Sequence, residues 1–153
     1  MTVQEFREKV RPFLKLSIDG KDFLIKEVVK FRLDDGSFYI KCWLNDGYVF
    51  ADDLNENMFI LVKKVKTLFV QPFAKKLEFD AKKFIFLYSA HAIAEEIQGR
   101  EIFKKRESEK FWDYKSEDNS YLSLGVVDQT KERADFYGWI IDTKLVEIHD
   151  NSL

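Results

Sequence analysis

The chain has 153 residues, of which 46% are hydrophobic, 16% aromatic and 34% charged. This length suits one domain whose core is large enough to fold without disulfide bonds. The 25 basic and 27 acidic residues leave a net charge of −2, which argues against the strongly basic surface that nonspecific nucleic-acid binding requires.

The cysteine content and the N-terminus bear on where the protein acts. A single cysteine, Cys42, cannot form an internal disulfide, and this favours a reducing cytoplasm. Residues 1–10 lack the basic-then-apolar plan of a signal peptide. The longest apolar run, 58–62, is far shorter than the roughly 20 residues of a membrane helix. We therefore expect a cytoplasmic protein that does not insert into a membrane. The many Lys and Glu residues, with few Gly and Pro, are also compatible with a thermophilic source.

The first element is a short helix expected over residues 2–14. Thr2 and Glu5 have the spacing of a capping box, in which each side chain bonds the other's backbone. Val3, Phe6 and Val10 recur at three- and four-residue intervals, which predicts one apolar face that docks on a sheet. Pro12 ends or kinks this helix.

Strands follow the helix. Two hairpin loops, 34–36 and 45–47, contain Asp-Gly pairs that tolerate the positive φ of tight turns. The apolar alternation shifts by one residue near Glu27 and Val28, which predicts a β-bulge there. Residues 52–57 offer several oxygen ligands, but their spacing does not match a calcium loop, so we predict no metal site. The expected strands are 14–18, 21–33, 37–44, 48–51 and 58–65.

The middle of the chain contains one ambiguous segment. A strand is expected at 67–70 and a crossover at Pro72. Period-two patterning resumes at 77–79 and 84–88, around a turn at 80–81. Residues 89–99 fit either a helix near 90–98, because Ala, Glu and Gln favour helices, or a strand with one polar defect. The charged segment 100–110 is expected to be an exposed hairpin or loop.

The last third is predicted to be an antiparallel meander with strands at 110–115, 121–127, 135–141 and 144–148. Residues 18–25 are similar to 79–86, so the single domain 1–153 is expected to contain two quasi-repeated β halves, 14–70 and 77–149. The predicted fold is mainly β. Its antiparallel meanders form a sandwich or two small barrel-like halves, with the short N-terminal helix and the optional second helix.

Several short sequence motifs follow one another in a particular order along residues 14–149. They are Ile18-x-Gly20-x-x-Phe23-x-Ile25, Trp43-Leu44, Leu77-x-Phe79 with Phe84, Asp113-Tyr114, Leu122-Ser123-Leu124, Gly138-Trp139-Ile140 and Val146-x-Ile148. In this order the chain resembles a bacterial and archaeal family, the domain of unknown function numbered 4178. In that family an acidic residue often follows the Leu-Ser-Leu element, whereas Gly125 stands there in this chain. The resemblance implies a β-rich fold, and it brings no assigned activity or site residue.

The reactive residue types do not assemble a recognisable catalytic motif. His149 lies close to the C-terminus, and His91 lies in the ambiguous segment. Cys42 sits within a hairpin strand, where a structural role is expected rather than nucleophilic catalysis with His91. One Cys and two distant His lack the ligand spacing of a zinc site, and no glycine-rich phosphate loop is present. We therefore predict no catalytic, cofactor-binding or metal-ligating residue.

One segment combines basic and aromatic side chains. Exposed aromatics beside cations stack on and neutralise single-stranded nucleic acid. The alternative is that Trp112 and Tyr114 face the core while the charges coat a solvated hairpin, because interspersed acids weaken the local field. The candidate binding surface is Lys104, Lys105, Arg106, Lys110, Trp112, Tyr114 and Lys115.

The sequence indicates three functions in order of preference. The first is a non-catalytic β-rich binding or assembly module that contacts a protein partner or a second copy of itself, since edge strands accept added strands. The second is a weak single-stranded nucleic-acid-binding domain. The third is a small hydrolase with an unrecognised carboxylate site, because the 27 acidic residues leave a carboxylate pair open.

Overall fold

The computed structural model describes residues 1–53, 55–99 and 107–149. Within them the chain is mainly antiparallel β, with one short α-helix and two 3₁₀ turns. The first half contains α1 (Val3–Lys9), β1 (Lys15–Ile18), β2 (Lys21–Leu33), β3 (Phe38–Leu44), η1 (Asn45–Gly47), β4 (Tyr48–Asp53) and β5 (Met58–Val65). The second contains β6 (Lys76–Phe79), β7 (Lys82–Gly99), β8 (Ser108–Ser116), β9 (Ser120–Val127), β10 (Asp135–Ile141), η2 (Thr143–Leu145) and β11 (Val146–His149).

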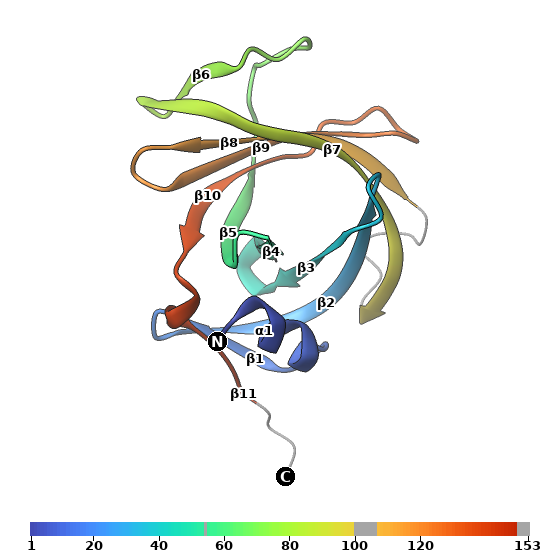
Figure 1. Cartoon of the computed structure of the whole chain (residues 1–153), viewed down its shortest axis with the longest axis vertical. Coiled ribbons are helices and arrows are strands. Elements are labelled where there is room, and N and C mark those ends of the chain that lie inside the picture. The colour runs from blue at the N-terminus through green and yellow to red at the C-terminus, as the bar shows by residue number, and fades with distance from the viewer. Residues whose placement is uncertain (54, 100–106, 150–153) are drawn as a thin grey trace.

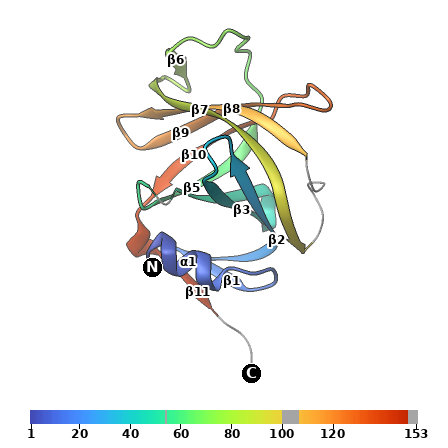
Figure 2. The ribbon, with the colours of Figure 1, turned by 45° about the vertical axis from the view of Figure 1, so that its right-hand side comes forward.

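The sheet closes on itself as an eight-stranded barrel. Its strands follow the order β2-β3-β4-β5-β10-β9-β8-β7, and the pairing of β7 with β2 joins the two ends. Figure 1 shows the ring of strands, and Figure 2 shows β7 lying beside β2. β1 and β11 extend the sheet at one end, and β6 extends it at the other.

The prediction of a mainly β fold is confirmed, but the prediction that the strands form a sandwich or two barrel-like halves was wrong. Four strands from each half of the chain, β2 to β5 and β7 to β10, build one shared barrel. Period-two alternation reports that a strand has a buried face and does not report how its sheet closes. The strand positions in the sequence were mostly confirmed. The strand expected at 67–70 is not present there.

The ambiguous segment 89–99 is strand, so the alternative of a second helix near 90–98 was wrong. These residues form the second half of the 18-residue strand β7. Ala92 and Ala94 are fully buried and pack against Phe31 and Phe111. Tertiary packing outweighs the helix propensity of these residues, because small side chains on this strand leave room inside the barrel for the facing aromatic rings.

The N-terminal helix is confirmed but ends at Lys9, before Pro12. Both capping-box hydrogen bonds between Thr2 and Glu5 are present. Phe6 packs its ring edge-on against those of Phe50 and Phe59 on the outer face of the barrel, with centroid separations of 5.4 and 5.2 Å. The predicted bulge in β2 also occurs, as a register shift between Ile25 and Glu27.

The outer face of the barrel is covered in two places. On β3, β4 and β5, side chains pack in one cluster with α1, β1, the start of β2 and Val146 of β11. On β8 and β9, Tyr114, Leu122 and Leu124 are covered by four side chains of residues 69–79. These four are Phe69, Phe73, Leu77 and Phe79. Two apolar clusters therefore lie outside the barrel, and two smaller ones, around Phe31 and Phe111 and around Val49 and Val62, fill only part of its interior.

Gly138 tests how closely the strands of the barrel approach one another. A Cβ atom at this position would lie 2.0 Å from the Leu61 carbonyl oxygen on β5. We expect Gly138→Ala to lower the free energy of unfolding by more than about 3 kcal/mol, because backbone must move to accept the methyl group. Urea unfolding followed by circular dichroism measures this loss.

Gly20→Ala is the matched control. Gly20 has a positive φ of 81°, and a Cβ there would meet no atom within 4 Å. Its substitution should cost only about 1 kcal/mol, through backbone strain alone. Equal losses in the two variants would contradict the close approach of β10 to β5.

Candidate functional site in the barrel

A small cavity lies inside the barrel. Its volume is about 50 Å³, which is room for a few water molecules or one small polar group. Side chains at alternate positions of β3, β4, β5, β7, β8, β9 and β10 line it. Its polar lining consists of Tyr39, Lys41, Tyr88, Glu109, Asp113, Tyr121 and Ser123, with Asp52 and Asp53 toward the opening.

A wider cleft opens at one end of the barrel. Its volume is about 940 Å³, and its rim includes the β2–β3 hairpin and described residues of the β4–β5 loop. Five residues line both the cleft and the inner cavity: Tyr39, Asp52, Asp53, Met58 and Tyr88. The two spaces therefore meet at these side chains, and the cleft is the entrance to the barrel interior.

The inner cavity contains a buried ion pair. The Lys41 ammonium lies 3.8 Å from Glu109 Oε1, and both residues are at least nine-tenths buried. The same ammonium lies 4.5 Å from the centre of the Phe136 ring and 5.2 Å from that of Trp43. Aromatic faces attract cations, so these rings compensate part of the cost of removing Lys41 from water.

A second buried carboxylate, Asp113, lies in the same cavity. It accepts hydrogen bonds from the Tyr121 hydroxyl and from Ser123 Oγ, the latter at 2.5 Å. Burial raises the pKa of Asp113 to about 6, although the two hydroxyl donors and Lys41 act in the opposite direction. Within the described part of the chain Asp113 takes part in no ion pair within 4.0 Å. Hydroxyl donors therefore make the direct contacts to its charge, and Lys41 acts on it only from a distance.

The rim of the cleft is anchored to the N-terminal helix by a buried ion pair. Arg7 of α1 donates to both carboxylate oxygens of Asp52, at 2.8 and 3.0 Å, and to the Phe38 carbonyl oxygen. Asp52 also accepts from the Ile40 amide. Because guanidinium and carboxylate satisfy each other in a bidentate pair, this contact fixes the rim and leaves Asp52 neutralised.

The residues named in the sequence as candidate nucleophiles and bases do not form a catalytic group. Cys42 is fully buried in the cluster under α1, and burial raises the pKa of its thiol. Asp128 Oδ2 accepts from Ser108 Oγ and faces His91 Nε2, each at 2.5 Å. In a serine-activating triad the imidazole bonds the hydroxyl itself, whereas here an aspartate oxygen lies between them.

The second histidine also lacks a catalytic setting. His149 Nε2 lies 3.0 Å from Ser17 Oγ, and Ser17 donates to Asp22. These side chains lie on the extension formed by β1, β2 and β11, outside the barrel. A seryl proton directed at Asp22 is not available to the imidazole, so this pair is a surface hydrogen bond. Among the described residues no cluster of three His, Cys, Asp or Glu side chains is arranged to hold a metal ion.

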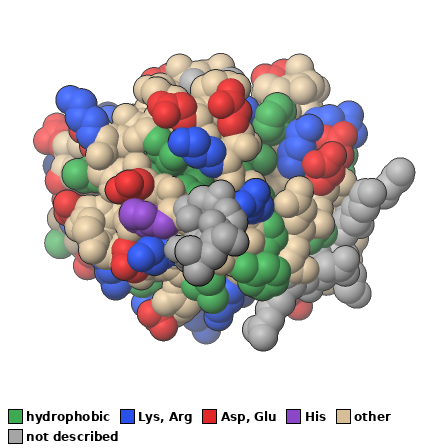
Figure 3. Space-filling view, turned by 90° about the horizontal axis from the view of Figure 1, so that it is seen from below, with side chains coloured by type: hydrophobic (Ala, Val, Ile, Leu, Met, Phe, Trp, Pro, Cys, Tyr) green, Lys and Arg blue, Asp and Glu red, His purple; other side chains and the backbone are tan. Residues whose placement is uncertain are grey.

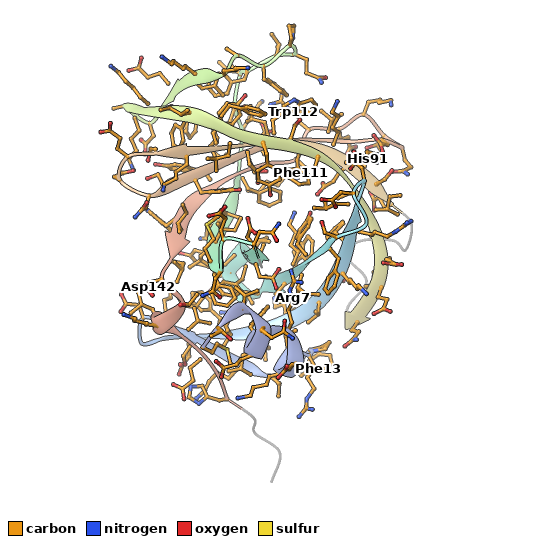
Figure 4. All side chains as sticks on the ribbon, in the orientation of Figure 1. Arg7, Phe13, His91, Phe111, Trp112 and Asp142 are labelled. Carbon is orange, nitrogen blue, oxygen red and sulfur yellow. The ribbon has the colours of Figure 1, made fainter. Side chains whose placement is uncertain are left out.

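The structure divides the basic and aromatic surface expected from the sequence between two faces of β8. Lys110, Trp112 and Tyr114 project outward, whereas Lys115 lines the entrance cleft. Figure 4 shows the neighbours Phe111 and Trp112 on opposite sides of the strand, with Phe111 inside the barrel. Lys104, Lys105 and Arg106 lie outside the described residues.

The two aromatic residues of that surface differ in exposure. Tyr114 is fully buried and donates its hydroxyl to the Ala74 carbonyl oxygen. Trp112 is half-buried, with its ring edge-on to Phe73 at 4.9 Å and the Lys110 ammonium 5.2 Å from its centre. Stacking of a base on Tyr114 would require residues 69–79 to move away. Figure 3 views a different part of the molecule, the end that carries α1 and β11, and there positive and negative side chains are interspersed.

Sequence reasoning missed the inward-facing polar residues. Lys41 lies between Tyr39 and Trp43 in one alternation phase, and Glu109 and Asp113 flank Phe111 in another. The sequence did contain a signal for these residues: charged residues alternate with large aromatic residues on the same face of a strand. Such a pattern is informative because a buried charge is costly unless it is paired or functional. Without knowledge of which face was enclosed, these residues looked like the solvent side of a strand.

Comparison of the chain with protein-family models, with curated proteins and with solved structures found no match. The resemblance to the family numbered 4178 therefore stays a prediction. No helix within the described residues is long and apolar enough to cross a membrane.

The buried Asp113 predicts a pH dependence of stability. Its pKa is about 6 in the folded protein, against an ordinary value of 3.8. Between these pH values the folded protein binds a proton that the unfolded chain releases. The stability from this group is therefore complete below pH ~4 and is lost as pH rises through ~6, by up to about 3 kcal/mol.

Asp113→Asn isolates this contribution, because other titrating groups cancel in the comparison. We expect the unfolding free energy of the wild type, minus that of the variant, to fall by about 3 kcal/mol between pH 3.5 and 7.5. Urea unfolding across this range measures it, and ¹³C NMR of the carboxyl carbon gives the pKa directly. A difference that stays constant with pH would contradict the burial of an ionisable Asp113.

Proposed function

We propose that this protein is a non-catalytic binding protein that takes a small molecule into its barrel. The observation that carries the proposal is the cleft of about 940 Å³ that leads into a polar inner cavity of about 50 Å³. Ligand sites are typically concave, about 300–1,000 Å³ in volume, largely apolar and equipped with a few convergent polar groups. The mouth of a small β-barrel is one of the places where they occur.

The lining supports selective binding. Tyr39, Phe111 and Tyr88 place their rings next to one another, with centroid distances of 6.0 Å from Tyr39 to Phe111 and 5.7 Å from Tyr88 to Phe111. Beneath them, Asp113 and the Lys41–Glu109 pair offer both charge signs. Rings exclude water, and the buried polar groups reject a ligand that leaves them unpaired.

The geometry favours binding over turnover. The Tyr39 and Tyr121 phenols are held protonated, since burial raises the pKa of each well above its ordinary value. Neither phenol is therefore available as a base, and Tyr121 donates its proton in the hydrogen bond to Asp113. Glu109 and Asp113 supply carboxylates of the kind the hydrolase alternative needs, but the inner cavity admits only a group the size of a few waters.

The assembly alternative rests on the strands at the two ends of the sheet. β6 and β11 each pair with one neighbour in the described chain, β7 and β1 respectively. Each is only four residues long, and short strands bearing charges are how proteins block edge-to-edge pairing. A protein partner or self-association on these edges is therefore the less favoured form of the binding proposal.

The nucleic-acid alternative and the cytoplasmic location stay predictions. The alternative is tested by binding of random oligonucleotides at low salt, where phosphate contacts are strongest. The prediction of a cytoplasmic location rests on the single cysteine, Cys42, which is free of any disulfide and buried.

Narrowing the entrance tests the proposal. Met58 is half-buried and lines both the cleft and the cavity, so Met58→Trp should close the junction between them. The probes are single fragments of about ten heavy atoms, in equal numbers of cationic, neutral and anionic compounds. We expect at least one to shift the backbone amides of Ala51 and Ser123 in ¹H–¹⁵N NMR spectra, and Met58→Trp to weaken it at least tenfold.

Lys63→Trp is the matched control, since it adds the same side chain at an exposed position of the same strand. Its affinity for the same fragment should stay within about twofold of the wild type. Two results would overturn the proposal. One is that no fragment of any charge shifts these amides at millimolar concentration, and the other is that both tryptophan variants bind alike while remaining folded.

A further inference from the structure

We infer that the ligand is an organic cation, whose protonated amine enters the inner cavity beside Asp113 while its apolar body remains in the outer cleft. This inference rests on the proposed function and deepens it by naming the chemical class of the ligand. It is carried by the charges and rings that line the two spaces.

The inner cavity has more negative than positive side chains. Among the described residues that line it, Lys41 is the cation, and its ammonium is paired with Glu109. Asp113 then stands as a second carboxylate, 5% exposed and held by hydroxyl donors. A buried carboxylate without a cation is costly, and a ligand ammonium would supply the missing charge where water cannot.

The aromatic side chains that line the cavity favour a cation, as its carboxylates do. The rings of Tyr39, Tyr88, Phe111, Tyr121 and Phe136 all line it. Aromatic faces attract ammonium groups within about 6 Å of the ring centre. The protein already uses this interaction in the same space, since the Lys41 ammonium lies 4.5 Å from the centre of Phe136.

The entrance cleft, like the inner cavity, is lined by more negative than positive side chains. Its described lining includes the carboxylates of Asp34, Asp35, Asp53 and Glu56, and Asp52 is neutralised by Arg7. Among the described residues that line the entrance, Lys115 is the remaining cation. A rim with this excess of carboxylates attracts cations toward the opening and repels anions.

The sizes of the two spaces set the orientation. About 50 Å³ is enough for an ammonium group and not for a ring or a branched chain. The outer cleft contains the apolar side chains of Met58, Leu87 and Ile140, against which a hydrocarbon body gains burial. A linear alkylammonium therefore fits with its charge inward.

The test compares three six-carbon probes with different head groups: hexylammonium, 1-hexanol and hexanoate. Binding is measured at pH 7.5 and physiological salt by ¹H–¹⁵N NMR titration of the Ala51 and Ser123 amides. We expect hexylammonium to bind at least tenfold more tightly than hexanol, and hexanoate to bind more weakly than hexanol. Asp113→Asn should weaken hexylammonium at least tenfold and leave hexanol within about threefold.

A rim variant keeps the test decisive if Asp113→Asn fails to fold. Asp53→Asn removes one entrance carboxylate and should weaken hexylammonium about threefold. Asp19→Asn removes the same charge on the β1–β2 turn, away from the cleft, and should change nothing. An equal loss in both variants would mean that net charge alone is responsible, and would overturn the inference.

The remaining outcomes separate this inference from the proposed function. If hexanol or hexanoate binds as tightly as hexylammonium at the same amides, the ligand is not selected by positive charge, and the inference fails while the barrel remains a binding site. Failure of hexylammonium alone, with other fragments still shifting these amides, has the same meaning. If no fragment of any charge shifts them, the proposed function itself fails.

Discussion

The antiparallel pairing of β2 with β7 is the interaction on which the rest of the structure depends. It joins residues far apart in the chain, such as Val29 with Ile97 and Phe31 with Ala94. Without it the eight strands would form an open sheet with two long edges, and neither face would be enclosed. Closure is what converts one face of each strand into an interior and makes the entrance cleft a way into it.

Closure also explains why the aromatic residues serve several cores. Phe6, Phe50 and Phe59 pack outside the barrel under α1, and Tyr114 packs under residues 69–79. Because the outer face is stabilised by these two covers, the interior does not have to supply all of the apolar burial. The interior therefore accommodates Lys41, Glu109 and Asp113, which a barrel filled only with apolar side chains would exclude.

The charged interior is the strongest pointer to function because it works against stability. Burial of Lys41, Glu109 and Asp113 costs free energy that apolar residues of similar size would not. Each is compensated, through an ion pair, aromatic faces or hydroxyl donors, yet the compensation is arranged around a cavity that opens to solvent through the cleft. Proteins place such locally unfavourable choices at sites of binding or catalysis, which is why the binding proposal and the charge of its ligand are argued from the same residues.

Local patterns in the sequence predicted most of the strands, because alternation and Asp-Gly loops act over a few residues. The capping box of Thr2 and Glu5, the bulge near Glu27 and the terminal meander all followed from such local patterns. The sequence did not determine that 89–99 is a strand. The alanines Ala92 and Ala94 pack against Phe31 and Phe111, and this contact is visible only in the folded barrel. Nor did the sequence determine the site. Only the pairing of β2 with β7 decided which strand faces are enclosed, and with that whether Lys41 and Asp113 face solvent or a cavity, because closure is a long-range contact that no local pattern encodes.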